Sequence, residues 1–454
     1  MSIDENHMSS SPNVLLLVVD SLRYDAVFGD ESYDTPTLDR LADESVVFDR
    51  CYSQGISTAP AMTAMLTGRY PLGYGGHWYI EDEQPTFAEG FHDNGYATGA
   101  IHSNPNVSRL RNFDKGFDTF EENILPFETE GLLERAPDDL LRYANKFVRL
   151  LRRTPYMPSP RVNDRLAKWI EVAPEPWFLW TQYMDVHGPY LPGGEFTYRN
   201  KFRAEKLWRK AAVNAAEDVI PAEHEKLRTN YRKEVEYFDD ELGKFLARLD
   251  WRGQLDDTLV VVVGDHGDEF REHDDYGHSN LPYDELTRVP LLISFPNGAD
   301  IDQPRRIDDL VRCVDILPTA LDLAGAELTA EMEQRLVGES LLPLLREGSA
   351  PSFDVIVTEK EIRGETALRF GFRTERWKFL YDGKADRTLL YDLDADPDET
   401  ENVADAHPEV VEEFEAHLDA RLERIERTSA GIQIPDLASQ PGVEERLQAL
   451  GYQE

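Results

Sequence analysis

The chain has 454 residues, enough for a large hydrophobic core, and it is strongly acidic. It contains 87 Asp and Glu residues against 48 Lys and Arg, which gives a formal net charge of −39 at pH 7. Such a charge excludes nucleic acid and anionic membrane surfaces as partners, because both are bound through cationic surfaces.

The same charge indicates the surroundings in which the protein works. In ordinary salt such a field would repel an anionic substrate, but the Debye length shrinks to about 3 Å at 1 M salt. We therefore expect a halophilic, cytoplasmic protein, with an acidic protein from an ordinary cell as the alternative. Residues 1–11 are polar and acidic, and the first apolar run, residues 14–19, is far too short to span a bilayer. The two cysteines, Cys51 and Cys313, are too few for a disulfide scaffold and are expected to be buried.

Continuous apolar runs of strand length define the expected core, and they occur at residues 14–19, 177–182, 259–263 and 291–295. Runs buried on both faces are typical of a parallel sheet between two helical layers. Helical patterns lie between them, for instance at residues 36–44, with Thr35 as the expected cap, and at residues 84–95. This alternation predicts an α/β sandwich with a large, mostly parallel sheet.

The remaining patterns divide the chain. Residues 12–345 are expected to form the main α/β domain, with helical insertions near 122–172 and 198–250. The amphipathic run at 140–151 is interpreted as a packing helix or, alternatively, a lid over the substrate, and residues 198–250 as a solvated helical face. A small antiparallel-sheet subdomain with a charged helix is expected over 346–430, followed by a polar tail, 431–454. Its strands are predicted near residues 370–373, 377–381 and 388–393.

Thr58 stands in residues 57–71, where a loop runs into a helix. Pro60 falls in the first helical turn, where its missing N–H costs nothing, and Gly68 closes the far end. A hydroxyl at such a helix start faces unpaired backbone N–H groups and the positive end of the helix dipole, which suits a tetrahedral oxyanion ester. Thr58 is therefore a candidate nucleophile, with a simple N-cap as the alternative.

Acidic residues follow two of the apolar runs. Asp20 ends the first run, and Asp265 and His266 follow residues 259–264. Ligands collect at the carboxyl ends of strands in open α/β sheets, so these groups are expected to converge. Two carboxylates held close together repel each other unless a cation lies between them. Asp20, Thr58, Asp265 and His266 thus predict a divalent metal site, for which the mixed O/N set favours Zn²⁺ or Mn²⁺ over Ca²⁺ or Mg²⁺. The alternative is a turn with an incidental histidine.

A series of segments resembles, in order along the chain, the sulfatase branch of the alkaline-phosphatase-like superfamily. The segments are residues 13–20, 35–42, the Thr58 loop with 67–71, 185–190, 264–267, 288–292 and 390–397. The resemblance runs nearly end to end. It implies an alkaline-phosphatase-like sandwich with a smaller C-terminal subdomain, a divalent metal and a small anionic ester as substrate.

This chain departs from the family pattern at the site itself. Sulfatases resemble one another in having a Cys or Ser nucleophile, which is oxidised to formylglycine; this chain has Thr58 at that position. They also share a nearby arginine, where this chain has Met62. The first family lysine falls on Ala100 and the second on His278. Threonine cannot become formylglycine by that route, because its oxidation would leave a ketone. The site therefore resembles that of the threonine-using phosphoethanolamine transferases.

The resemblance implies roles for three further histidines. His187 and His278 either hold a second metal, giving one or two ions per site, or bind the ester oxygens directly. His102 faces the ester or protonates the leaving group as a general acid, with a buried structural histidine as the alternative. His273 is expected at the surface.

The sequence therefore predicts a metal-dependent phosphoester hydrolase or phosphotransferase that works through a covalent ester on Thr58. A sulfatase using unmodified Thr58 is the second hypothesis, and a non-catalytic binding protein on this fold is the third. The sequence does not determine the oligomeric state or the alcohol of the ester.

Overall fold

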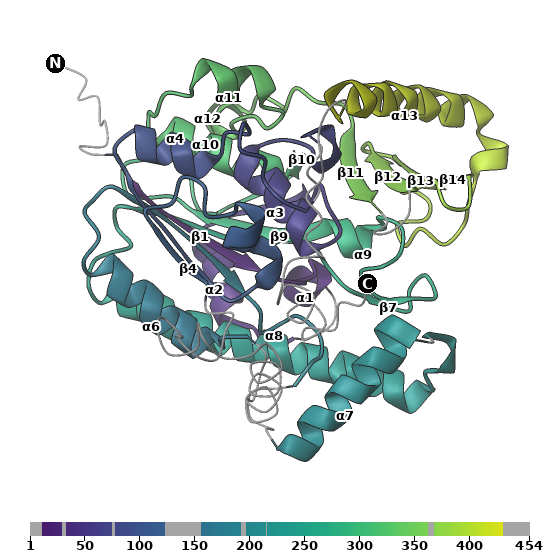
Figure 1. Ribbon diagram of the computed structural model, residues 1–454, viewed down its shortest axis with the longest axis horizontal. Helices are drawn as coiled ribbons and strands as arrows, with labels where there is room; N and C mark the ends of the chain where they lie inside the picture. Colours follow the sequence, from purple (N-terminus) through teal and green to yellow (C-terminus); the bar gives the residue numbers. More distant parts are fainter. Residues whose placement is uncertain are drawn as a thin grey trace, which may run out of the picture.

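The computed structural model describes residues 11–29, 33–74, 78–122, 156–191, 197–214, 216–361 and 367–429. The amphipathic run at 140–151 and the polar tail 431–454 lie outside these residues. Within them, an eight-stranded sheet, a four-stranded sheet, a two-stranded pair and the surrounding helices form the molecule (Figure 1). No helix of the described part is long and apolar enough to cross a membrane.

The large sheet has eight strands in the order β10-β2-β9-β6-β1-β5-β3-β4. They span β1 (Asn13–Val19), β2 (Val46–Tyr52), β3 (Ala97–His102), β4 (Thr119–Glu122), β5 (Trp177–Tyr183), β6 (Thr258–Gly264), β9 (Arg288–Ser294) and β10 (Arg305–Arg312). The neighbours pair in parallel except at β9, which runs antiparallel to both β2 and β6. The mostly parallel sheet is confirmed, but the expectation of a parallel strand at residues 291–295 is wrong. A central strand is buried on both faces in either direction, so its apolar run carries no information about direction.

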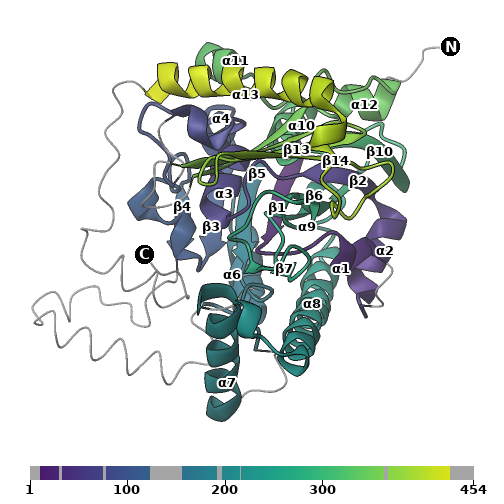
Figure 2. The same ribbon diagram turned by 90° about the vertical axis from the view of Figure 1, so that its right-hand side faces the viewer.

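Helices cover both faces of this sheet (Figures 1 and 2). Alternate residues of β1 enter opposite cores because strand side chains point to alternate faces. Val14, Leu16 and Val18 pack in one core with α3 (Thr58–Thr67), α4 (Phe87–Asp93), α10 (Ile316–Leu323), α11 (Ala330–Arg335) and α12 (Leu342–Glu347). Leu15, Leu17 and Val19 pack in the other with α2 (Pro36–Glu44), α6 (Ser159–Ile170) and α8 (Pro221–Asp250).

Two helical expectations need correction. Helix α8 is not only a solvated face, since twelve of its 30 residues are buried. Helix α2 has the expected bounds, but Thr35 makes no side-chain cap. Asp239 of α8 instead accepts the N–H groups of Thr37 and Leu38 at 3.0 and 2.8 Å. A residue about two hundred positions away thus satisfies the helix start, which local sequence could not indicate.

The second sheet is antiparallel and lies in the order β11-β12-β13-β14. Its strands are β11 (Ile356–Glu361), β12 (Leu368–Arg373), β13 (Trp377–Asp382) and β14 (Arg387–Asp392). Helix α13 (Pro408–Ser429) runs across this sheet in both views and adds Phe414 and Leu418 to its core (Figures 1 and 2). The small C-terminal sheet expected from the sequence is therefore confirmed.

Shorter elements connect the layers: α1 (Asp25–Phe28), α7 (Tyr198–Arg209), α9 (Asp284–Thr287), and the two-stranded pair β7 (Glu269–Phe270) and β8 (Tyr276–Gly277). Cys51 and Cys313 are both buried, as expected, with their sulfur atoms 3.8 Å apart.

Candidate active site

The candidate residues meet at the carboxyl edge of the large sheet. Asp20 follows β1, and Asp265 and His266 follow β6, while His102 ends β3. His187 lies four residues beyond β5, and Thr58 starts the helix that follows β2. These six side chains are at most 3% exposed. Strands β1, β2, β3, β5 and β6 point the same way, so their carboxyl ends form one edge, as the sequence led us to expect.

Asp20, Asp265 and His266 form the centre of the site, with ligand atoms within 4.8 Å of one another. His266 donates its Nδ1–H to the Gly267 carbonyl at 2.8 Å, so the lone pair of the ring lies on Nε2. That nitrogen is buried, lies 3.6 Å from Asp20 Oδ1 and 3.7 Å from Asp265 Oδ2, and has no hydrogen-bond partner among the described residues. Two carboxylates and an imidazole lone pair aimed at one point fit a divalent cation.

The electrostatics of these groups lead to the same conclusion. Burial, followed by the charge of Asp265, raises the pKa of Asp20. Burial likewise raises the pKa of Asp265 to about 7 and lowers that of His266 to about 4. In the chain alone the two carboxyls thus resist ionising together, and a bound cation would reverse that preference.

Ser21 and Gln182 support the two carboxylates. The Ser21 N–H donates to Asp265 Oδ1 at 3.1 Å, and its hydroxyl donates to Asp20 Oδ1 at 3.2 Å. Ser21 has φ of 60°, a left-handed conformation that is uncommon without glycine. The Gln182 amide donates to Asp265 Oδ2 at 2.8 Å and to Asp20 Oδ2 at 3.4 Å. These contacts hold the two carboxylates side by side.

Thr58 is the first residue of α3 and its hydroxyl donates to Asp20 Oδ2 at 3.1 Å. The N-cap position belongs to Ser57, and neither residue caps the helix through its side chain. Pro60 lies in the first turn, and Gly68 ends the helix with φ of 67°, as the sequence predicted. The Thr58 hydroxyl therefore faces the acidic centre from a helix N-terminus, where N–H groups are unpaired within the helix.

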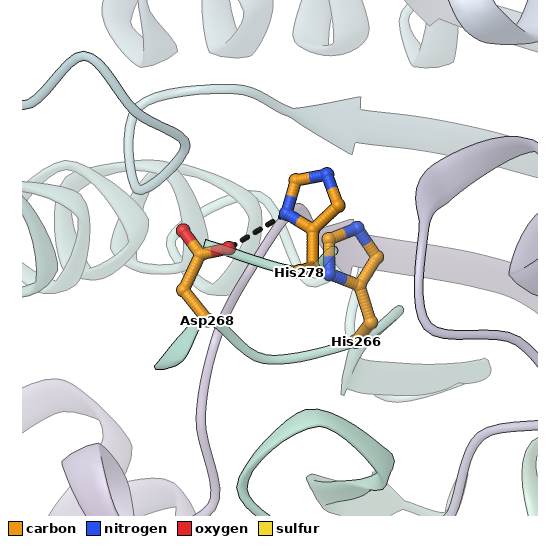
Figure 3. A group of neighbouring side chains, drawn as sticks. All are labelled: His266, Asp268 and His278. Carbon is orange, nitrogen blue, oxygen red and sulfur yellow. Dashed lines mark hydrogen bonds and ion pairs between the residues drawn. The ribbon is translucent and has the colours of Figure 1, made fainter. Parts of the chain in front are cut away.

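His278 lies beside this centre and is held by a residue that the sequence analysis did not single out. Its Nδ1 donates to Asp268 Oδ1 at 2.7 Å (Figure 3). Asp268 Oδ2 accepts the Tyr190 hydroxyl at 2.5 Å. Burial lowers the pKa of His278, but the hydrogen bond and charge of Asp268 outweigh it, so the pKa is raised. In Figure 3 the His278 ring lies next to that of His266, and their centroids are 4.6 Å apart.

His187 completes the group of histidines. Its ring centroid lies 5.8 Å from that of His278, and its Nδ1–H donates to the Gly188 carbonyl at 2.6 Å. The structure therefore brings His187, His266 and His278 together, although 79 residues separate the first two in sequence.

His102 occupies a different kind of environment. Its ring packs on Phe120 and Trp180 at centroid distances of 5.1 and 5.0 Å, and burial lowers its pKa to about 3. Nδ1 accepts the Asn104 N–H at 3.3 Å, so the ring proton lies on Nε2. At neutral pH His102 is thus an uncharged donor. Its neighbour Asn104 contacts the centre directly, since its amide donates to Asp20 Oδ2 at 2.8 Å.

Several residues at or near the candidate site were missed or misplaced by sequence reasoning. Gln182, Asn104 and Asp268 were not identified; Gln182 ends an apolar run, and the other two each lie two residues beyond a quoted histidine. His273 is not at the surface: its side chain is 11% exposed, stacks on Tyr283 and donates to Glu285 at 2.5 Å. The charges around it gave no local signal of burial.

The second sheet reaches the site through its charged side chains. Lys360 of β11 donates to the backbone carbonyls of His278, Ser279 and Asn280, at 3.3, 2.5 and 3.3 Å. Arg369 of β12 donates to the Ser279 carbonyl at 2.8 Å. The C-terminal sheet therefore anchors the segment that holds His278.

Comparison with known proteins identifies the family of the chain. A family model described as Sulfatase matches residues 12–326, and one described as N-sulphoglucosamine sulphohydrolase, C-terminal, matches residues 272–428. An arylsulfatase of Clostridium perfringens is 25% identical over 90% of this chain and 92% of its own length.

Solved structures show the same fold. The phosphonate monoester hydrolase of Agrobacterium radiobacter superimposes with a TM-score of 0.70 at 20% identity, over 91% of this chain and 96% of that one. A 2-O GAG sulfatase superimposes with a TM-score of 0.67 at 20% identity, over 93% and 94% of the two chains. The family model, which matches most of the length of the chain, shows that the chain belongs to the sulfatase family and is a sulfatase-like hydrolase.

Proposed function

We propose that this protein cleaves a phosphoester, with Thr58 as the nucleophile and a covalent ester on Thr58 as the intermediate. The observation that supports this most directly is the hydrogen bond from the Thr58 hydroxyl to Asp20, at a buried helix start beside Asp265 and His266. Asp20 is placed to orient the hydroxyl, and the N–H groups of the first turn of α3 face a tetrahedral oxyanion. The Thr58 oxygen bonds to phosphorus as the bond to the substrate alcohol breaks, and the alcohol leaves with the proton that Thr58 gives up. Water, or an acceptor alcohol in a transferase, then attacks the same phosphorus and frees Thr58.

Asp20, Thr58, Asp265 and His266 would hold the divalent metal, with Zn²⁺ or Mn²⁺ favoured by the mixed oxygen and nitrogen donors. When bound, such an ion supplies Lewis-acid activation and charge neutralisation. The residues of the chain then keep their own tasks. Ser21 and Gln182 orient the carboxylates, and the Gly267 carbonyl fixes the tautomer of His266.

We further propose that His278 and His187 bind the ester oxygens and do not hold a second ion. Each oxygen of Asp268 accepts a hydrogen bond, one from His278 and one from Tyr190, so Asp268 is oriented by these two donors. Asp268 also raises the pKa of His278, which favours a cationic imidazolium. A cation at this position would correspond to the second lysine of the sulfatase pattern, which falls on His278. The prediction is one metal ion per chain.

Two further positions support phosphate over sulfate chemistry. Met62 stands at the position of an arginine in the sulfatase pattern, and Ala100 at the position of a lysine. Both side chains are fully buried in the hydrophobic core. Neither Met62 nor Ala100 carries a charge. The site therefore lacks both cations together with the formylglycine precursor.

Sulfate-ester hydrolysis by unmodified Thr58 is the second candidate. It is favoured by the family match and by the arylsulfatase relative. The proposed division of the chain is the same for both candidates: a catalytic domain over 12–345 and a C-terminal subdomain over 346–430.

The test compares matched aryl esters: a phosphate monoester, a phosphate diester and a sulfate ester. Each is assayed in molar KCl, where a halophilic chain is expected to be stable, with Mn²⁺, Zn²⁺ or Ca²⁺ added singly. Wild type is compared with Thr58→Ala and Thr58→Ser, and quenched reactions are examined by mass spectrometry for a phosphoryl adduct on Thr58. Phosphoester turnover that Thr58→Ala abolishes and Thr58→Ser retains in part supports the proposal; a preference for the sulfate ester refutes it.

A further inference from the structure

A strongly basic helix stands out in this acidic chain. Between residues 199 and 210 there are six Lys or Arg residues and a single acid, Glu205, whereas acids outnumber bases 87 to 48 over the whole chain. These residues belong to α7 and the turn after it. Figures 1 and 2 show α7 at the edge of the molecule, beside the beginning of α8.

Helix α7 is packed directly against the segments that hold His187 and His278. The Trp208 ring lies 5.0 Å from that of Tyr190, and a Cβ on Gly188 would lie 2.5 Å from it. A Cβ on Gly277, which precedes His278, would lie 3.4 Å from the same ring. The basic helix is therefore adjacent to the proposed ester-binding histidines.

The start of α8 forms the opposite wall and is tied to the same strand. His224 lies 3.1 Å from the Tyr276 hydroxyl, through its Nδ1, and Tyr276 belongs to β8. Both walls thus rest on β8, which leads into His278.

Between the two walls lies a hollow of about 330 Å³, lined by Arg203, Lys206, Leu207, Lys210, Ala222, Glu223 and Lys226. Glu223 is paired with Lys210 at 2.5 Å. Across the described ranges, no carboxylate lies within ion-pair distance of Arg203, Lys206 or Lys226, and all three are exposed. The hollow therefore has a surplus of three positive charges.

We propose that this hollow binds a second anionic group of the substrate, so that the natural substrate is a polyanionic ester. The proposal rests on the proposed function, because it takes the neighbouring histidines as the place where the reacting ester sits. Three like charges close together repel one another, and an anion between them removes that repulsion. In high salt only charges in near contact retain their attraction, which explains why a field of −39 does not prevent binding there.

The first test measures binding without turnover. Thr58→Ala protein is titrated calorimetrically with dextran sulfate and with uncharged dextran, at the lowest KCl concentration that keeps the protein folded. Three backgrounds are compared: no further change, the triple change Arg203→Gln, Lys206→Gln and Lys226→Gln, and the control Arg209→Gln. Arg209 is an exposed base on the same helix but does not line the hollow. Because exposed charge contacts are individually weak, the triple change is expected to weaken dextran sulfate binding by about tenfold or more, and the control to leave it unchanged.

The second test links the hollow to the active site. Dextran sulfate is expected to raise the KM of an aryl ester in wild type and not in the triple variant. The proposal is overturned if the triple variant binds dextran sulfate as tightly as the Thr58→Ala background does. It is also overturned if Arg209→Gln loses as much affinity as the triple variant, or if dextran sulfate binds wild type without changing the KM. If the proposed function is wrong, wild type shows no phosphoester turnover. The calorimetric comparison can still be made in that case, because it does not depend on turnover.

Discussion

Glu269 provides a prediction about stability that follows from its burial. It lies in β7, three residues after His266, and it is fully buried. Oε1 accepts the Asn280 amide at 3.2 Å, but Oε2 has no hydrogen-bond partner within the described part of the chain. Burial, followed by the charge of Glu285, raises the pKa of Glu269 from 4.5 to about 10. In the folded protein this carboxyl therefore holds its proton at neutral pH.

The sign and size of the effect follow from linkage. Because the folded pKa is raised, the unfolded chain loses its proton first, and stability is lost as pH rises from 4.5 towards 10. At about 1.4 kcal/mol per pH unit, the cost at pH 7 is about 3 kcal/mol. Glu269→Gln has the same shape and does not ionise. It is expected to raise the free energy of unfolding by about 3 kcal/mol at pH 7.

The assay is denaturant unfolding followed by circular dichroism, from pH 5.5 to pH 8.5 at constant KCl. The difference between Glu269→Gln and wild type is expected to grow by about 1.4 kcal/mol per pH unit. Glu225→Gln, an exposed change on α8, is the control and is expected to show no such trend. A constant difference, or a Gln variant less stable than wild type at pH 7, would refute the reasoning. Either result would indicate that the carboxylate is ionised in the folded protein, beside His273 and Glu285, whose ligand atoms lie within 4.8 Å of it.

Three other predictions concern the site and its support. Asp265→Asn is expected to lose the bound metal, measured by elemental analysis, while its far-ultraviolet spectrum stays that of wild type; unchanged metal content would contradict the proposed ligand set. Asp268→Asn removes the charge behind His278 and is expected to lower kcat/KM about tenfold with one metal per chain retained; a loss of metal would indicate that Asp268 is itself a ligand. Asp239→Ala removes the acceptor at the start of α2 and is expected to lower the free energy of unfolding by about 1–2 kcal/mol, whereas its exposed neighbour Asp240→Ala is expected to change it by less than half as much.

The sequence by itself determined the features that depend on local pattern. The apolar runs became β1, β5 and β6, and Pro60 and Gly68 mark the two ends of α3 as predicted. The small antiparallel sheet was also predicted, because alternating strands and turns recur there at short range. Asp20 and Asp265 could be placed together because both follow parallel strands, whose carboxyl ends share one edge.

The tertiary structure alone decided which partners these groups have. The antiparallel direction of β9, the capping of α2 by Asp239, and the contacts of Gln182 with Asp20 and Asp265 all join residues far apart in sequence. The exchange of the family lysine for His278 could be read from the sequence, but the carboxylate that raises the pKa of this histidine could not. Asp268 lies ten residues away, and only the turn through β7 and β8 brings the two together. Periodicity records which face of an element is buried, whereas a hydrogen-bond partner or a pKa depends on which elements meet, and that is a property of the packed chain.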